Sequence, residues 1–441
     1  MLSPNHHISI RHSRSTNSLG CSLLAFGLLL GFGSLSIAQS RNSDHWAGTW
    51  AAAPHPDVNL RGAYTLDTTF REFVHVSAGG SAIRVVLSNE YGTSDLKIGG
   101  VTVAFPVARP VPNVHANAAG LPDTPDQPTS AIQISSAVSV RFSNNPSVTI
   151  APGALAISDP VPMHLTHLSD LAVTFFIPGQ RIDRITYHYL ASQTNFEVTG
   201  NELNAAVFDN PRPVSSWRFL KGIDVQGKTK GTIVCLGDSI TDGSLSTPNT
   251  NHRYPDFLAA RLQAHGSTAG FGVVNEGIGA NAVLHDLNFV GANALERFDR
   301  DVLAQPDVRY LILLEGINDI RRITNTSLPP MVITADDLIN GYLQLITRAH
   351  LHGIKVIGAT LTPDGGSRGE SEIGEAIREK VNDFILHGGM FDGVVDFAKA
   401  TADPADARRF STTAGGRDHL HPNDTGYRLM GDSIDLKLFG K

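Results

Sequence analysis

The sequence predicts two kinds of fold in one chain: a strand-rich region followed by an α/β region built on a parallel sheet. Short alternating or β-branched runs, separated by turn residues, fill residues 45–227. Strand-like and helix-like segments alternate over residues 228–441. Residues 1–38 differ from both regions, because a polar lead without acids precedes a short apolar run.

Length and composition set the first limits on function. The 441 residues are 41% hydrophobic and 17% charged, which is typical of a globular protein and long enough for two domains. The formal net charge of -7 gives no basic excess that would attract nucleic acid or an anionic membrane, so we expect neither as a partner. The cysteines are Cys21 and Cys235, and loss of the N-terminal segment would leave no intramolecular disulfide.

Residues 1–38 have the organisation of a secretory signal peptide. Arg11 and Arg14 lie in the lead, residues 23–32 read LLAFGLLLGF, and Ser36 and Ala38 form a small-residue cleavage site. The apolar run is too short to span a bilayer permanently. We therefore expect a secreted or periplasmic protein without stable membrane insertion after cleavage. An uncleaved N-terminal anchor is the alternative.

The β-rich region, residues 45–227, predicts a sandwich or jelly-roll-like accessory domain. The expected strands are 70–77, 82–88, 96–105, 132–142, 147–150, 171–177, 185–190 and 216–220. Turn residues such as the NEYG of 89–92 lie between them. The stretch 107–129 is rich in Pro, Ala and Asn, and we expect it to be a long loop.

The β-rich region carries few signals of chemistry. Its histidines are His55, His75, His115, His164, His167 and His188. They lack metal-ligand spacing, so we expect surface residues or hydrogen-bonded core residues. Trp46, Trp50 and Trp217 could form a sugar-binding face, although core packing is favoured. The sequence leaves open whether this region selects the substrate or serves only as a cap.

The α/β region begins after the GKTKG stretch at 227–231. We expect strands at 233–236, 271–275, 309–314, 354–359 and 393–396, and helices at 254–264, 290–303, 335–351, 371–386 and 424–438. The strands are short apolar runs of the kind that is buried on both faces of a parallel sheet. Helices should therefore cover both faces, with right-handed crossovers. Cys235 should be a small buried residue in the first strand.

Polar side chains follow the ends of three of these strands. Ser239 follows the first in a Gly-Asp-Ser turn, the Gly-rich sequence NEGIGANA follows at 275–282, and Asn318 follows in EGIND at 315–319. Because the carboxyl ends of parallel strands share one edge, these residues should converge. The sequence DHLHPND at 418–424 precedes the last expected helix.

This set contains what acyl transfer requires. Ser239 is the candidate nucleophile, His421 the base that takes its proton, and Asp418 the carboxylate that fixes the His421 tautomer. Oxyanion donors are available from the Ser239 amide, the amides at 279–280 and the Asn318 side chain. The alternative is that Asp238 and Ser239 only cap a helix. We expect Asp242 and Asp319 to be cap or network residues.

Four short sequence motifs in the α/β region resemble the conserved blocks of the SGNH/GDSL hydrolase superfamily. They are GDS at 237–239, the Asn-x-Gly-rich turn at 275–281, GxND at 316–319 and DxxH at 418–421, within residues 232–438. The resemblance implies a flavodoxin-like α/β/α fold and serine-dependent ester hydrolysis without a metal or other cofactor. It implies Ser239, His421 and Asp418 as catalytic residues, with Ser239 and Asn318 as oxyanion donors.

One position departs from the pattern of this family. Where many members have the oxyanion glycine, this chain has Ala280, and Gly279 is one residue earlier. A backbone N–H survives this replacement if the turn does not need a positive φ there. The Ala280 amide is therefore the favoured donor, and the Gly279 amide is the alternative.

The β-rich region resembles the N-terminal module of some secreted bacterial members, many of them carbohydrate esterases, for instance in WAGTWAAAP at 46–54. The resulting hypothesis is a secreted esterase that removes an O-acyl group, with acetyl favoured, from a small-molecule or polysaccharide ester of a carbohydrate. A lipid acyl hydrolase, lysophospholipase or arylesterase is the alternative enzyme. A carbohydrate-binding protein with an inactive hydrolase domain is the alternative of another class. The sequence does not predict the oligomeric state.

Overall fold

The computed structural model describes residues 45–57, 63–107, 128–286, 291–323 and 332–440. The expected signal peptide and most of the expected loop at 107–129 lie outside the described residues. Residues Asn42–Lys441 form one compact unit. No described helix is both long enough and apolar enough to cross a membrane.

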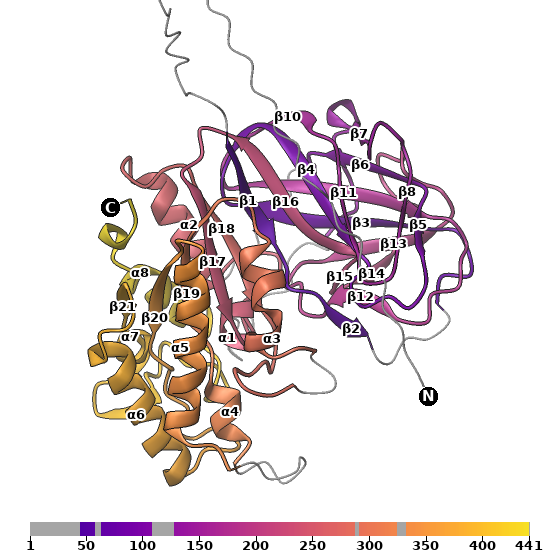
Figure 1. Ribbon diagram of the computed structural model, residues 1–441. Helices are drawn as coiled ribbons and strands as arrows, with labels where there is room; N and C mark the ends of the chain where they lie inside the picture. The colour runs from indigo at the N-terminus through magenta and orange to yellow at the C-terminus, as the bar shows by residue number, and fades with distance from the viewer. Residues whose placement is uncertain (1–44, 58–62, 108–127, 287–290, 324–331, 441) are drawn as a thin grey trace, which may run out of the picture. The chain divides into compact units, whose positions relative to one another are not determined.

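Two antiparallel sheets make up most of residues 45–227, which we call the β region (Figure 1). The first sheet has the order β1 (His45–Ala51), β16 (Leu220–Gly227), β4 (Gly80–Ser88) and β10 (Val161–Leu165), with β9 (Leu155–Ile157) beside β4. The second has the order β14 (Arg212–Val214), β13 (Asn195–Thr199), β3 (Thr68–Val76), β11 (Ser169–Ile177), β6 (Gly100–Ala104) and β7 (Val138–Val140). Smaller sheets join β15 (Trp217–Arg218), β12 (Ile185–His188) and β2 (His55–Asp57), and β5 (Leu96–Ile98) with β8 (Val148–Ile150).

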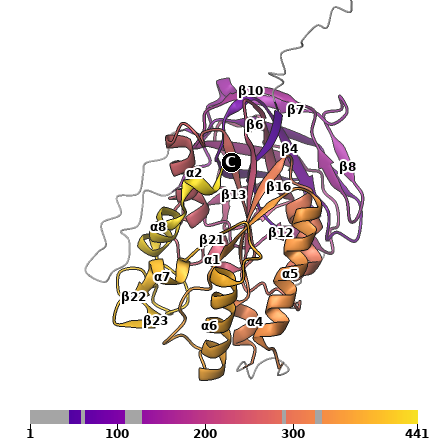
Figure 2. The ribbon, with the colours of Figure 1, turned by 60° about the vertical axis from the view of Figure 1, so that its left-hand side comes forward.

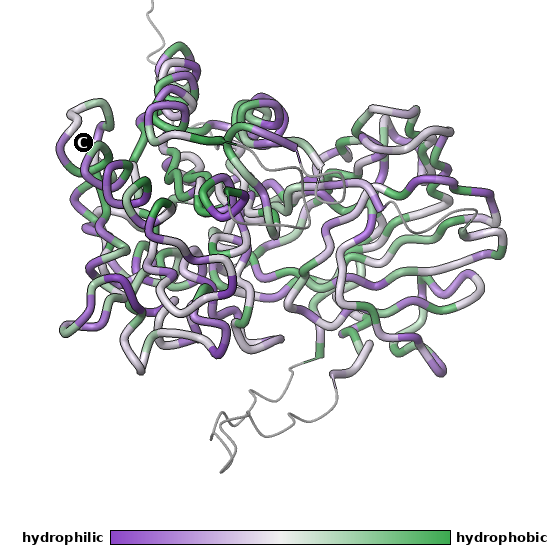
Figure 3. The backbone as a smooth tube through the Cα atoms, turned by 90° about the horizontal axis from the view of Figure 1, so that it is seen from below, coloured by the Kyte–Doolittle hydropathy of each residue, from purple (hydrophilic) through white to green (hydrophobic). Residues whose placement is uncertain are grey.

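Alternating side chains build the core of the β region. Along β10, for example, every second residue is buried, and such alternation can be followed along the tube in Figure 3. Trp50 and Trp217 are buried, and their rings meet edge to face with centroids 4.9 Å apart. The Arg84 guanidinium covers the Trp46 ring at 4.0 Å. The favoured expectation of core packing is therefore confirmed for Trp50 and Trp217.

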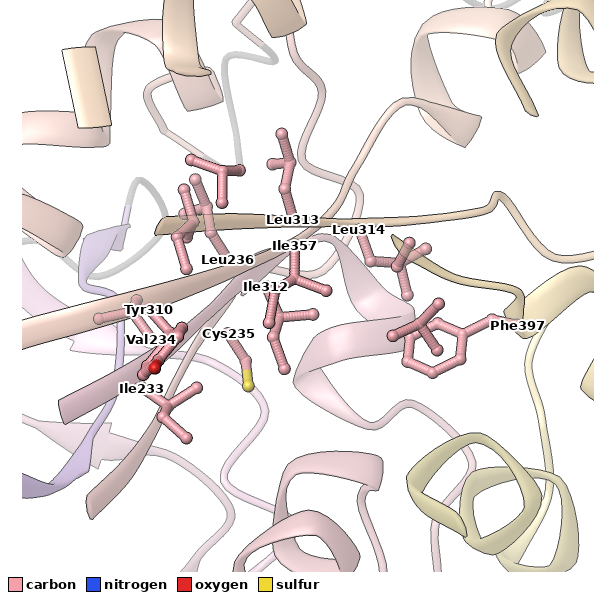
Figure 4. Packing of buried hydrophobic residues seen from close by; sticks show 14 of the residues in the cluster. Ile233, Val234, Cys235, Leu236, Tyr310, Ile312, Leu313, Leu314, Ile357 and Phe397 are labelled. Carbon is pink, nitrogen blue, oxygen red and sulfur yellow. The ribbon is translucent and has the colours of Figure 1, made fainter. Parts of the chain in front are cut away.

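The α/β region, residues 228–440, contains a parallel sheet of order β18 (Phe271–Gly277), β17 (Gly231–Gly237), β19 (Val308–Leu314), β20 (Lys355–Ala359) and β21 (Gly393–Val395). If the five strands are numbered in the order in which they occur along the chain, their order across the sheet is 2-1-3-4-5. Every residue of β17 is buried, including Cys235 as expected, and Figure 4 shows its side chains packed with those of β19. The two β-branched residues Ile233 and Val234 suit such a strand.

Helices lie on both faces of this sheet (Figures 1 and 2). On one face α2 (Tyr254–Ala264) packs against α8 (Asp424–Ser433), and on the other α5 (Ala335–Leu351) packs against α6 (Glu372–His387). The shorter elements are α1 (Ser239–Asp242), α3 (Ala294–Phe298), a π turn (Asp299–Leu303), α4 (Ile317–Arg321), α7 (Phe397–Thr401), β22 (Ala402–Asp403) and β23 (Asp406–Phe410), and the 3₁₀ turns Ile134–Ser136 and Leu436–Leu438.

Several expected boundaries were wrong. The strand expected at 96–105 is two strands, β5 and β6, which pair with different partners. The strand expected at 132–142 contains a 3₁₀ turn before β7, and the one expected at 216–220 is interrupted at Phe219, whose φ is 62°. The helix expected at 290–303 begins at Ala294, because Asn293 caps it, and the helix expected at 424–438 ends at Ser433.

The β region packs directly against β17 and β18. The Gly48 amide donates to Thr232 Oγ1 at 2.8 Å, and Ser77 Oγ donates to the Val273 carbonyl at 2.9 Å. A Cβ added to Gly272 would lie 1.9 Å from the Gly48 carbonyl oxygen, so no side chain fits where these backbones cross. The β region thus holds the two strands that lead to the candidate site near their starts.

Candidate active site

Ser239 lies at the carboxyl end of β17, at the start of α1. The turn is tight: a Cβ at Gly237 would meet the Leu314 carbonyl oxygen at 2.2 Å, so only glycine fits there. The Asp238 carboxylate caps α1 by accepting a hydrogen bond from the Ile240 amide at 2.8 Å. Asp238 therefore does what the capping alternative predicted, whereas Ser239 points its hydroxyl to another element.

That hydroxyl meets His421, which is 182 positions later in the chain. Ser239 Oγ lies 2.8 Å from His421 Nε2, and His421 Nδ1 lies 2.6 Å from Asp418 Oδ2. An ionised carboxylate can only accept, so Nδ1 carries the proton and Nε2 is free to accept the one on Ser239. Asp418 Oδ1 also accepts the backbone amides of Leu420 and His421, which holds the DxxH loop in place.

The electrostatics of Asp418 suit this role. Burial raises the pKa of Asp418, but hydrogen bonds from the side chain and backbone of His421 outweigh burial and hold the pKa well below its usual range. Asp418 is thus a carboxylate at any pH near neutrality, and it keeps the His421 ring in one orientation.

Asn318 and the turn at 278–281 follow β19 and β18, the two strands that flank β17. Asn318 Nδ2 donates to the Asn281 carbonyl at 2.8 Å, which leaves its second N–H available. The Ile278 amide donates to the Gly237 carbonyl at 3.0 Å, so this turn is tied to the nucleophile turn. Asp319 accepts the amides of Val283 and Leu284 at 2.8 and 3.0 Å. It is a network residue, as expected.

The amides of Gly279 and Ala280 are in different situations. The Gly279 amide donates to Asp242 Oδ2 at 3.2 Å. The Ala280 amide makes no hydrogen bond to any described residue. Ala280 has a φ of 62°, in the region that favours glycine, so the turn does need a positive φ there. From the sequence we accepted alanine here only if the turn did not need a positive φ, and the turn does need one. Ala280 adopts this strained conformation and keeps its backbone N–H.

A family model matches the part of the chain that carries these residues. Residues 235–429 match the family model described as the GDSL-like Lipase/Acylhydrolase family. The matched segment, here called the GDSL-like domain, contains Ser239, Asn318, Asp418 and His421, and the family that it matches is one of acylhydrolases, which act on ester bonds.

Solved structures with a similar fold include a putative lipolytic protein of the G-D-S-L family from Desulfitobacterium hafniense DCB-2, with 23% identity over 46% of this chain and 96% of that one, at a TM-score of 0.35. The acetyl xylan esterase AlAXEase has 22% identity over 46% and 96% of the two chains, with a TM-score of 0.35. An acetyl xylan esterase from Geobacillus stearothermophilus has 18% identity over 48% and 96%, with a TM-score of 0.37. No curated protein matched this chain.

A buried arginine holds the strand ends of the GDSL-like domain together. The Arg297 guanidinium is fully buried and donates to the carbonyls of Gly237 and Glu276, at the ends of β17 and β18, at 2.9 and 2.6 Å. It also donates to Asn281 Oδ1 at 2.9 Å. One side chain thus fixes the nucleophile turn, the next strand end and the turn at 278–281 relative to one another.

Carboxyl groups under the site have altered acidity. Burial, together with nearby Asp319, raises the pKa of Asp238 to about 7 against the opposing effects of the Ile240 amide, His421 and Arg297. Burial likewise raises the pKa of Asp319 to about 6 and that of Glu315 well above its usual range. The carboxyl oxygens of Glu315 have no hydrogen-bond partner among the described residues. The site therefore does not hold all of these carboxyls as anions at neutral pH.

The structure brings every predicted site residue to one edge of the sheet. Sequence reasoning missed Arg297, Asn281 and His188 as parts of the surrounding network. Asn281 lies in the NEGIGANA block and could have been suspected from its position. Arg297 lies on a short helix outside the four blocks, and His188 lies in the β region, so nothing in the sequence connects them to Ser239.

Proposed function

We propose that this protein is a secreted serine esterase that hydrolyses O-acyl esters, with acetyl favoured, on a carbohydrate, through an acyl-enzyme on Ser239. The observation that carries the chemistry is the continuous chain of contacts from Ser239 Oγ to His421 and from His421 to Asp418, at 2.8 and 2.6 Å. This arrangement is that of a serine nucleophile, its base and an orienting carboxylate.

The first half-reaction forms the acyl-enzyme. Ser239 Oγ attacks the ester carbonyl carbon while its proton moves to His421 Nε2. The carbonyl oxygen becomes an oxyanion, for which the amides of Ser239 and Ala280 and the free N–H of Asn318 are the available donors. Collapse of the intermediate breaks the ester C–O bond, and the proton on His421 passes to the departing alcohol oxygen. The acyl group remains on Ser239.

The second half-reaction releases the acid. His421 takes a proton from water as the water oxygen attacks the acyl carbon, and the same donors stabilise the second oxyanion. The bond to Ser239 Oγ then breaks, and His421 returns the proton to Oγ. Each residue ends in its starting state, and the products are the free alcohol and the carboxylic acid.

The proposed substrate class rests on the chain outside the GDSL-like domain. The expected signal peptide supports export, and the resemblance of the β region to modules of carbohydrate esterases supports a sugar ester. We also propose a specific fold for each region. The strand order 2-1-3-4-5 supports a flavodoxin-like sheet in a hydrolase domain of residues 228–441. The two antiparallel sheets support a sandwich or jelly-roll-like domain of residues 45–227 before it.

The first experiment compares wild type with Ser239→Ala on p-nitrophenyl acetate, with Ser244→Ala as a matched control in the same loop. The proposal predicts hydrolysis by wild type and by Ser244→Ala, and none above background by Ser239→Ala. Equal slow hydrolysis by all three would refute the esterase and favour a binding protein.

The second experiment measures acyl release from acetylated glycans, lysophospholipids and aryl esters by the active protein. Preference for the glycans supports the sugar ester. Preference for lysophospholipids or aryl esters, or equal release from all, would refute it without affecting the esterase. N-terminal sequencing of the exported protein tests secretion, with Gln39 expected as the first residue.

A further inference from the structure

A buried hydrogen-bonded bridge connects the β region to the turn that carries the Ala280 amide. It begins at His188, the last residue of β12, which is 4% exposed. His188 Nδ1 lies 2.8 Å from the Ala53 carbonyl oxygen, and His188 Nε2 lies 3.0 Å from Asp242 Oδ1. The ring thus joins a residue after β1 to the last residue of α1, the helix that begins with Ser239.

Asp242 continues the bridge with its other carboxyl oxygen. Asp242 is 3% exposed, and its Oδ2 accepts the Gly279 amide at 3.2 Å. Gly279 and Ala280 share a peptide bond, and this peptide carries the N–H of Ala280. A path of contacts that starts in the β region therefore reaches the residue directly before the Ala280 amide.

A second contact acts on the same turn. The Ala53 side chain packs with Ile278 and with the methyl group of Ala280 in a small apolar cluster. Ala280 has a φ of 62°, a conformation that is strained for an L residue and persists only where the surroundings hold it. Ala53 and His188 are among those surroundings, and both belong to the β region.

The hydrogen bonds of this bridge require a donor proton between each pair of facing atoms. Both ring nitrogens of His188 face oxygen acceptors, so the pair needs a proton on each nitrogen or one on Asp242. A buried carboxylate that loses its partner is costly, and it turns or takes up a proton. Removal of the His188 donor should thus disturb Asp242 first and the Gly279 contact next.

We propose that His188 is a positioning residue for ester hydrolysis, which holds the Ala280 amide toward the oxyanion through Asp242 and Gly279. The β region is then part of the active-site frame rather than only a substrate-binding module. This inference rests on the proposed function, because it assigns a use to the oxyanion turn of that reaction.

Two substitutions at His188 separate the two halves of the bridge. The side-chain nitrogen of His188→Gln falls near the position of Nε2 and can still donate to Asp242. The side-chain nitrogen of His188→Asn falls near the position of Nδ1 and can donate only to the Ala53 carbonyl. We expect H188N to lower kcat about tenfold with KM changed less than about twofold, because loss of an oxyanion donor costs about 10²–10³ and a misdirected donor costs part of this. H188Q should keep kcat within about threefold of wild type.

Ser77→Ala is the matched control. It removes another buried contact between the two regions, at Val273 near the start of β18, far along the strand from the turn. We expect S77A to lower the melting temperature without a matching loss of kcat. A loss of kcat in S77A as large as in H188N, at a similar melting temperature, would overturn the inference and make His188 a purely structural residue. Wild-type kcat in H188N, or a change confined to KM, would overturn it as well.

A second pair of variants covers the case in which H188N does not fold. Asp242→Asn can accept the Gly279 amide and donate to His188 Nε2, so it should retain kcat within about threefold, whereas Asp242→Ala should lose about tenfold or more. Full activity in D242A would overturn the inference. If the wild-type protein hydrolyses no ester, the proposed function is refuted. If the wild type is active and H188N is equally active, only the inference about His188 is refuted.

Discussion

The Gly279 amide donates to Asp242 Oδ2 at 3.2 Å, and this contact distinguishes it from the next amide along the chain. An N–H that already has a buried carboxylate partner is a poor donor to a reaction intermediate, because that partner would have to be given up. The adjacent Ala280 amide has no described partner. We therefore favour Ala280 over Gly279 as the backbone donor of the oxyanion site.

Ala280→Gly tests this assignment. Glycine keeps the N–H and adopts a positive φ without strain, so we expect kcat within about threefold of wild type and a melting temperature changed by only a few degrees, about what 1 kcal/mol shifts. The measurements are steady-state kinetics and thermal unfolding. A loss of kcat of a hundredfold would contradict the account, since it would mean that the methyl group rather than the amide is needed.

Asn318→Ala removes the side-chain donor. We expect kcat to fall by about 10²–10³ with little change in KM, because the lost hydrogen bond forms only as charge develops on the oxygen. Kinetics on p-nitrophenyl acetate give both constants. A rise in KM with unchanged kcat would instead make Asn318 a substrate-binding residue.

Asp418→Asn tests the orientation of His421. An amide at this position no longer fixes the proton on Nδ1, so we expect kcat to fall by about 10²–10⁴. The fold should persist, because Asp418 is 39% exposed at its side chain. Activity within threefold of wild type would contradict the proposed role of Asp418, provided that circular dichroism shows an unchanged fold.

The sequence predicted which residues meet at the edge of the sheet better than it predicted the limits of the strands. Ser239, Asn318, Asp418 and His421 follow strand ends or precede a helix, and the shared edge of a parallel sheet brings such residues together whatever the exact strand limits. Strand limits depend on particular neighbours. The break between β5 and β6 lies at Gly99, where a Cβ would lie 2.6 Å from the Phe176 ring, and no local pattern shows such a contact.

The role of the β region was the larger omission. His188 was expected to be a surface residue or a hydrogen-bonded core residue, and it is indeed buried and hydrogen-bonded. Its partner Asp242 is 54 positions away at the end of the helix α1, and their contact depends on how β1 and β18 pack. Isolated histidines without spacing signals do not reveal such contacts.

Stability should depend on pH through Asp224. Burial raises the pKa of Asp224 to about 7, with Arg84 acting in the opposite direction. Because the folded-state pKa lies above the unfolded value, the folded protein keeps this proton while the unfolded chain releases it. Stability from this group is therefore present at low pH and is lost as pH rises through about 7.

Asp224→Asn removes this titration. We expect the variant to gain stability relative to wild type by on the order of 2 to 4 kcal/mol between about pH 4 and pH 8, with no further gain above that range. Denaturant unfolding of both proteins across this range provides the comparison. A difference that does not change with pH would show that the pKa of Asp224 is the same in the folded and the unfolded protein, which contradicts the expected shift.

The most direct test of the central claim is detection of the acyl group on Ser239. The enzyme is mixed with an excess of p-nitrophenyl acetate, quenched in acid within the first turnover and analysed by peptide mass spectrometry. The account predicts one added acetyl group on the peptide that contains Ser239, and none on that peptide in Ser239→Ala. Acetylation at another residue, or ester turnover that persists in Ser239→Ala, would contradict it.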